Sequence, residues 1–206
     1  MLMSVAKRAL ALPIVFETYQ TLIGAPSCHQ RFIHDYVKAS AGEAVLDIGC
    51  GTGVSLDSLT QSIAYTGVDL SESYIERARA QHGHQGTFLA ADVTVDVPQI
   101  AGPYDRAFAF GVLHHLSDEQ ISGLIGNLIR WLKPQGSFTS IDPCFTNPQN
   151  AFASYLIRND RGQFVRTPEA LSVLFAERFV VDAKVVTGML RIPYTQVILR
   201  MKLRND

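Results

Sequence analysis

The chain has 206 residues, of which 47% are hydrophobic and 18% are charged, and its formal net charge is −1. This composition excludes a disordered chain and argues against a nucleic-acid groove, which usually carries a strong basic excess. The length predicts a single domain, residues 1–206, with a full hydrophobic core. The three cysteines are widely spaced without a Cys-x-x-Cys pair, so we expect no metal site, no disulfide framework and a cytoplasmic location.

Residues 1–40 predict an N-terminal helical cap. The apolar run after Lys7 and Arg8 is short and is broken by Pro13, which argues against a secretory signal peptide. Nothing in the sequence approaches a transmembrane span. His29 and His34 could line a pocket under the cap, although isolated helical histidines are more often surface residues. Apolar and aromatic side chains recur at helical spacing in two sets: Phe16, Tyr19, Leu22 and Ile23, then Phe32, Ile33, Tyr36 and Val37.

The stretch from Val45 to Gly53 is the most informative part of the sequence. It begins as an apolar run with β-branched residues, which predicts a buried strand, and it ends in three glycines at alternate positions. Apolar residues at helical spacing follow from Val54, so we expect a helix to begin there. A strand, a glycine turn and a helix N-terminus together predict a binding corner for a nucleotide-like ligand.

The spacing of the glycines argues against a dinucleotide at this corner. The Gly-x-Gly-x-x-Gly pattern fails because Val54 or Leu56 stands where the third glycine is needed. Asp47, just before the turn, would repel a pyrophosphate and attract a cation. The stretch resembles the first motif, Asp-x-Gly-x-Gly-x-Gly, of the class I S-adenosylmethionine-dependent methyltransferases. The resemblance implies that S-adenosylmethionine, whose product is S-adenosylhomocysteine, is bound here by Asp47, Gly49, Cys50, Gly51 and Gly53.

A second strand is predicted over residues 65–70 and ends at an acidic residue. Asp69 follows the first glycine by about 20 residues, where doubly wound folds place the carboxylate that binds ribose hydroxyls. Ser71 already supplies the cap of the next helix, from Glu72 to about Gln81, which favours the ligand role for Asp69 over a capping role. Leu70 lies in the same motif, and the resemblance places it at the cofactor.

A third strand is predicted over residues 87–90. The resemblance implies that Asp92, just beyond it, accepts a hydrogen bond from the adenine amino group and that Val93 donates its backbone N–H to the ring. The alternative for Asp92 is an ordinary loop aspartate.

The fourth predicted strand, residues 104–110, leads into a turn with two histidines. The resemblance places Gly111 and Val112 at the methionine end of the cofactor, and His114 and His115 near the transferred methyl group. Either imidazole could deprotonate an acceptor hydroxyl, because imidazole titrates near neutral pH. Adjacent residues on a turn point apart, so at most one should face the acceptor, and both histidines could instead be structural.

Ser117 and Gln120 predict a capping box at the start of the next helix, which closes near Trp131 before a fifth strand at residues 138–142. Residues 143–170 form an irregular insert with a helical part at 152–157, and Thr167 with Pro168 predicts another helix start. The resemblance places this insert over the acceptor pocket. Four residues are candidate acceptor contacts, the last three suited to an anionic acceptor by forked hydrogen bonds: Tyr19, Arg158, Arg161 and Arg166. A solvated loop is the alternative for the arginines.

Two final strands, residues 180–186 and 195–203, allow a closing hairpin. Strand and helix patterns alternate over residues 45–175, which predicts a parallel α/β sheet with helices on both faces. The resemblance implies a Rossmann-like doubly wound sheet of seven strands with an antiparallel last strand. We expect methyl transfer to a small-molecule acceptor by in-line displacement, with an RNA or protein methyltransferase or a catalytically silent cofactor-binding subunit as alternatives; the oligomeric state stays open.

Overall fold

The computed structural model describes residues 24–59, 62–160 and 162–204. The predictions for Phe16, Tyr19, Leu22, Ile23 and Arg161 lie outside the described residues.

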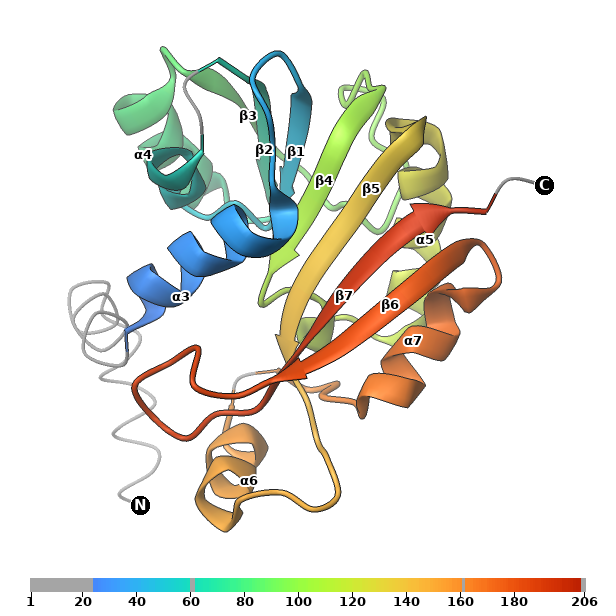
Figure 1. Ribbon diagram of the computed structural model, residues 1–206. Helices are drawn as coiled ribbons and strands as arrows, with labels where there is room; N and C mark the ends of the chain where they lie inside the picture. Colours follow the sequence, from blue (N-terminus) through green and yellow to red (C-terminus); the bar gives the residue numbers. More distant parts are fainter. Residues whose placement is uncertain (1–23, 60–61, 161, 205–206) are drawn as a thin grey trace.

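Seven strands form one mixed sheet in the order β3-β2-β1-β4-β5-β7-β6 (Figure 1). Strands β1 to β5 pair in parallel, whereas β7 is antiparallel to both of its neighbours. The predicted doubly wound sheet with an antiparallel last strand is therefore confirmed. The strands are β1 (Ala44–Ile48), β2 (Ala64–Asp69), β3 (Gly86–Ala90), β4 (Tyr104–Phe110), β5 (Leu132–Pro143), β6 (Phe179–Val186) and β7 (Gln196–Leu203).

The helical elements follow the predicted alternation. Ser71 caps α4 by accepting from Tyr74, and Ser117 with Gln120 forms the predicted capping box of α5. The helix expected from Val54 is only a short 3-10 helix, η2. The helical elements are α3 (Ala25–Phe32), which continues into the π-helix η1 (Ile33–Val37), η2 (Val54–Ser58), α4 (Glu72–His82), η3 (Leu113–His115), α5 (Asp118–Trp131), α6 (Ala151–Arg158) and α7 (Pro168–Ala176).

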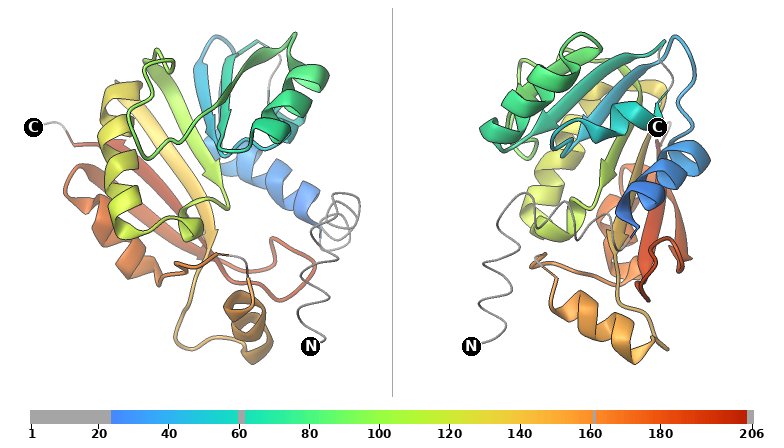
Figure 2. Two further views of the ribbon diagram at one scale, coloured as in Figure 1. Left: turned by 180° about the vertical axis from the view of Figure 1, so that it is seen from behind. Right: turned by 90° about the vertical axis from the view of Figure 1, so that its left-hand side faces the viewer.

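Alternate residues of β1 face two separate hydrophobic clusters, because successive side chains of a strand point to opposite faces. Val45 packs with Phe32 and Val37 of the α3–η1 segment. Leu46 and Ile48 belong to the larger cluster that contains residues of α5 and α7. Figures 1 and 2 show α3 on one face of the sheet and α5 with α7 on the other, so both faces are covered.

The parallel strands β1, β2, β4 and β5 all end at one edge of the sheet, which is the lower edge in Figure 1. The glycine turn follows β1 there, and the turn with two histidines follows β4. Helix α6 lies beyond the end of β5 (Figure 1). This edge therefore collects the predicted site residues, as expected for a doubly wound sheet.

Candidate cofactor and acceptor site

The glycine turn after β1 adopts a left-handed backbone, with φ of +73° at Gly49 and +54° at Gly51. A Cβ added to Gly49 would lie 2.5 Å from Cγ2 of Val112, so the turn packs directly against the segment that follows β4. A Cβ added to Gly51 would meet no protein atom within 4 Å. Gly49 therefore serves close packing, whereas Gly51 borders open space.

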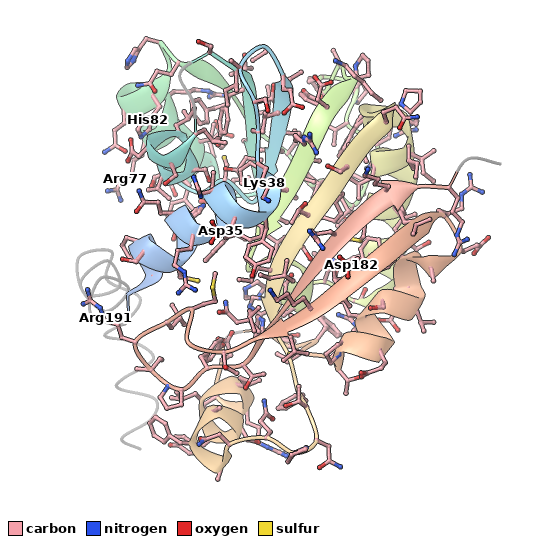
Figure 3. The ribbon with its side chains drawn as sticks, in the orientation of Figure 1. Asp35, Lys38, Arg77, His82, Asp182 and Arg191 are labelled. Atoms are coloured by element: carbon pink, nitrogen blue, oxygen red, sulfur yellow. The ribbon has the colours of Figure 1, made fainter. Side chains whose placement is uncertain are left out.

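That open space is a cavity of about 740 Å³. Helix α3 forms one wall, the glycine turn and η2 form another, and α4 contributes Tyr74 and Arg77. Figure 3 shows Arg77 on α4, near α3. The cavity brings together four of the predicted cofactor residues: Asp47, Gly49, Cys50 and Gly51.

Asp47 is 1% exposed and accepts a hydrogen bond of 2.7 Å from the hydroxyl of Tyr65. Burial raises the pKa of Asp47 to about 7, against the lowering effect of hydrogen bonds with Ser55 and Tyr65, and the charge of Asp69 raises it further. Burial thus opposes a negative charge on this carboxyl. A cation beside it would favour the ionised form.

His29, one of the two histidines that the sequence offers as pocket residues under the N-terminal cap, lines this cavity from α3, whereas His34 is exposed and pairs with Asp35. The ring of His29 stacks on Phe110, with centroids 4.4 Å apart, and its Nε2 lies 3.0 Å from Oγ of Ser55. Burial lowers the pKa of His29 to about 4, so the ring is neutral at physiological pH. The available signal was helical spacing, because His29 precedes the buried Phe32 and Ile33 by three and four residues.

Asp69 at the end of β2 holds the glycine turn. Its Oδ2 accepts from the backbone N–H of Gly51 at 2.9 Å, and its Oδ1 accepts from that of Ser71 at 2.8 Å. Leu70 beside it is 76% exposed. The carboxylate of Asp69 thus links the glycine turn after β1 to the segment after β2 by hydrogen bonds.

The remaining predicted cofactor residues lie outside the lining of this cavity. Gly111 follows β4 and donates its N–H to the carbonyl of Ile141 at 2.8 Å. Asp92 accepts from both the backbone N–H and the hydroxyl of Thr94, at 2.9 and 2.7 Å. Those outside are Gly53, Asp69, Leu70, Asp92, Val93, Gly111 and Val112.

His114 is buried between two carboxylates. Its Nδ1 lies 2.9 Å from Oδ1 of Asp142 at the end of β5, and its Nε2 lies 3.3 Å from Oδ1 of Asp160 beyond α6. Burial alone would lower the pKa of His114, but the hydrogen bonds and charges of the two aspartates raise it to about 9. The ring of the exposed His115 lies 4.1 Å from that of His114, so the two rings do not point apart.

Arg158 and Arg166 occupy different environments. Arg158 is exposed at the end of α6, where it donates to Ser154 and lies 5.6 Å above the ring of Phe145. The side chain of Arg166 is 12% exposed and spans the turn before α5, donating to the carbonyls of Leu113 and Leu116 and to Asp118. Tyr19 and Arg161 lie outside the described residues.

The described residues contain neither a metal-binding group nor a membrane-spanning helix. Residues 24–59, 62–160 and 162–204 contain no group of three or more His, Cys, Asp or Glu that could hold a metal ion. Within the same part of the chain, no helix has the length and apolar character needed to cross a membrane.

Comparison with known sequences gives one family. Residues 45–136 match the family model described as a methyltransferase domain. An O-methyltransferase, resE, of Aspergillus sclerotiorum is 32% identical over 115 residues, which cover 52% of this chain and 42% of that protein. Phosphoethanolamine N-methyltransferase 1 of Zea mays is 32% identical over 108 residues, covering 50% of this chain and 22% of that protein. The chain thus spans less than half the length of these two relatives.

Solved structures share the fold. The pyocyanin biosynthetic protein PhzM has a TM-score of 0.74 at 18% identity, covering 97% of this chain and 61% of that one. The N-methyltransferase NodS of Bradyrhizobium japonicum, in complex with S-adenosylhomocysteine, has a TM-score of 0.66 at 17% identity, covering 86% of each chain. A putative methyltransferase in complex with the Haloferax volcanii Trm112 methyltransferase activator has a TM-score of 0.75 at 15% identity, covering 96% of this chain and 97% of that one.

Proposed function

Because this chain belongs to the class I S-adenosylmethionine-dependent methyltransferase family, we propose that it transfers a methyl group from S-adenosylmethionine to the oxygen or nitrogen of a small-molecule acceptor. We include both oxygen and nitrogen as acceptor atoms because the relatives are named as O-methyltransferases and as phosphoethanolamine N-methyltransferases. The free, buried thiols of all three cysteines support a reducing cytoplasm as its location.

The cavity at the glycine turn carries this proposal. Its volume of about 740 Å³ lies within the usual range for small-molecule sites. Any side chain at Gly51 would project into the open space, and the carboxyl of Asp47 is buried at its base. These residues suit a cationic ligand that approaches the backbone closely.

The chain would hold the cofactor along the edge of the sheet. Asp69 would accept from the ribose hydroxyls while keeping its bond to Gly51, since a carboxylate can accept several hydrogen bonds. Asp92 and Val93 would bind the adenine, with Leu70 against the ring. Gly111 and Val112 would leave room for the methionine end. When bound, S-adenosylmethionine supplies a methyl group already activated on its sulfonium, so the protein mainly aligns the reactants and excludes water.

An acceptor hydroxyl also needs a place for its proton, and His114 is the residue we propose. Asp142 holds Nδ1 of the ring, so Nε2 of the neutral ring is the atom that would receive the proton as the acceptor oxygen bonds to the methyl carbon and sulfur keeps the electron pair. Because the pKa of His114 is about 9, the neutral ring is the minor form near pH 7, and turnover with a hydroxyl acceptor should rise with pH towards 9. Asp160 would shift from Nε2 to admit the acceptor. His115, exposed beside it, is the alternative, and Arg158 is the arginine placed to bind an anionic acceptor.

Calorimetry with S-adenosylmethionine tests the cofactor assignment. We expect Asp69→Ala and Gly51→Val to abolish measurable binding, the first by removing the acceptor for ribose and Gly51, the second by filling the cavity. Asp182→Ala is a matched control, because Asp182 lies on β6, away from α3 and α4 (Figure 3), and pairs with Arg200. Unchanged affinity in both site variants would refute the assignment.

With a hydroxyl acceptor, His114→Ala should slow turnover far more than it weakens cofactor binding, and the same comparison for His115→Ala decides between the two rings.

A second candidate is a methyltransferase that requires a partner chain. The observation that favours it is the structural neighbour in complex with a methyltransferase activator, which matches this chain over nearly its full length. Incubating the purified chain alone with S-adenosylmethionine and a pool of small acceptors discriminates the two. Consumption of the cofactor without a partner excludes the second candidate.

A further inference from the structure

The loop between β6 and β7 contacts two parts of the site that are far apart in sequence. Near its start, the carbonyl of Gly188 accepts a hydrogen bond of 3.1 Å from Arg31 of α3, and Met189 packs in the same cluster as Cys28 and Phe32. Figure 1 shows this loop between α3 and α6, and Figure 3 places Arg191 beside the start of α3. The loop is therefore fastened to the wall of the cofactor cavity.

Near its end, the same loop reaches the buried histidine. The hydroxyl of Tyr194 donates a hydrogen bond of 2.6 Å to Oδ2 of Asp160. The other oxygen, Oδ1, accepts from the backbone N–H of Gly162 at 3.0 Å and lies 3.3 Å from Nε2 of His114. The two oxygens of Asp160 are thus divided between Tyr194 on one side and His114 on the other.

We propose that Tyr194 is a positioning residue for methyl transfer to a hydroxyl: before the acceptor enters, its own hydroxyl holds Asp160 against Nε2 of His114 and so sets how firmly the imidazole keeps the proton that it must lose before it can act as a base. This inference rests on the proposed function for its catalytic meaning. The arrangement itself rests on the contacts that Asp160 makes with Tyr194 and His114.

Of the charged groups around His114, Asp160 is the one whose position depends on Tyr194. Asp142 is held independently, because its Oδ1 also accepts from the backbone N–H of His114 at 3.2 Å. The charge of Arg166 is directed to Asp118 and to backbone carbonyls. Burial raises the pKa of the Cys144 thiol, near Asp142, to about 12, so that group is neutral. Among the described residues, the ring of His115 and the backbone of Gly162 also lie beside His114.

Asp160 responds to these contacts. Burial raises its pKa, but the hydrogen bonds from His114, Tyr194 and the backbone of Gly162 outweigh burial and hold the pKa below its ordinary value. Without the hydroxyl of Tyr194, Oδ2 loses the donor that fixes the rotation of the carboxylate. Oδ1 would then spend less time facing His114.

Proton NMR of the full chain tests the inference without any acceptor. The signal of His114 is identified by its loss in His114→Gln, and its titration midpoint is followed in Tyr194→Phe, which keeps the ring and removes only the hydroxyl. Because a carboxylate in contact moves a partner's titration by about 1–3 pH units, we expect Tyr194→Phe to lower the midpoint by about half a unit and Asp160→Asn to lower it further. Tyr155→Phe, on the exposed side of α6, should leave it unchanged.

Three outcomes would overturn the proposal. The midpoint could stay fixed in Tyr194→Phe while it falls in Asp160→Asn, which would show that Asp160 needs no positioning. It could stay fixed in both variants, which would show that Asp160 does not act on His114. It could fall equally in Tyr155→Phe, which would point to a general change in folding. Binding of S-adenosylhomocysteine, measured by calorimetry on the same samples, tests the proposed function separately, and Tyr194→Phe should leave that affinity within about twofold.

Discussion

Gly49 and Gly51, which are separated by one residue, have different roles in the same turn. Gly49 is pressed against Val112, while Gly51 faces the cavity. Both have positive φ, so any substitution at either position also carries backbone strain.

Gly49→Ala should therefore destabilise the protein more than Gly51→Ala. The strain of a left-handed alanine costs about 1–2 kcal/mol at both positions, and the contact with Val112 adds about 1–3 kcal/mol at Gly49 alone. Urea unfolding of each variant measures the difference. The double variant Gly49→Ala, Val112→Ala should show a smaller cost than the sum of its single changes, since the truncated side chain makes room. Simple additivity would contradict the contact.

At this scale the sequence predicts the glycine turn, because the left-handed backbone at Gly49 and Gly51 favours glycine, while the contacts of these glycines and Asp47 with a cofactor stay a prediction. It names His29 together with His34 as pocket residues and does not separate the two, because that depends on where α3 lies against the sheet. It also does not predict that Asp160 meets His114, because the two residues come from segments joined only by the folded sheet.

Among the elements, η2 departs most from expectation. A helix was predicted from Val54, but only Val54–Ser58 is helical, and as a 3-10 helix. The connection has to return to the start of β2 at Ala64, which leaves little length for a longer helix. Leu56 of η2 and Leu59, which follows it with an extended backbone, pack in the same hydrophobic cluster. The sheet face is covered instead by α3, which precedes β1 in the chain.

The turn between β4 and α5 is held by an element from much later in the chain. Arg166 donates to Leu113, Leu116 and Asp118, and the N–H of Phe164 donates to the carbonyl of His114 at 2.9 Å. These contacts place the segment after α6 over the histidine turn. They indicate a structural role for Arg166, while its predicted contact with an acceptor stays a prediction.

Arg166→Gln should lower the free energy of unfolding by about 2 kcal/mol, because hydrogen bonds to a charged group contribute about 1.5–3 kcal/mol and several are lost together. Arg158→Gln, at an exposed position with one side-chain hydrogen bond and a contact with the ring of Phe145, should change it by less than about 0.5 kcal/mol. Chemical denaturation of both variants checks the contrast. Equal effects would mean that the hydrogen bonds of Arg166 to the turn between β4 and α5 do not contribute to stability.

For the whole molecule, the resemblance predicts the seven-stranded sheet and its antiparallel last strand, and both are confirmed. The hydrophobic pattern also predicts most element positions, because strands β4 and β6 and helices α4 and α7 have clear periodicity or caps. The sequence does not predict that β5 begins at Leu132, well before residue 138, since its pairing with Tyr104 is a tertiary contact with a register shift.

The charge of His114 should shape stability against pH. Its pKa is about 9 in the folded protein and 6.5 as the ordinary value, so its contribution is complete below pH 6.5 and is lost as the pH rises through 9. The loss amounts to about 3 kcal/mol. The shifts of His29, to about 4, and Asp47, to about 7, act at lower pH. Burial raises the pKa of the three thiols above their ordinary value of 9.0, so they lower stability mainly from pH 9 upward, and the difference between the wild type and a variant without His114 reports on His114.

Urea unfolding at several pH values between 7 and 9 measures this slope. The His114→Gln variant is the control, and its stability should change little over the same range. A wild-type protein as flat as the variant would show that the two aspartates do not hold a proton on the ring.

The fastening of α3 to the β6–β7 loop has a consequence for how the molecule fails on heating. One wall of the cavity depends on Arg31 and on the apolar contacts of Met189, and these sit on a connection rather than within the sheet. Connections open at lower free energy than central strands. Warming should thus separate α3 from the β6–β7 loop while the strands are still paired. The protein would then bind a small molecule in this cavity more weakly at temperatures where the sheet is still folded.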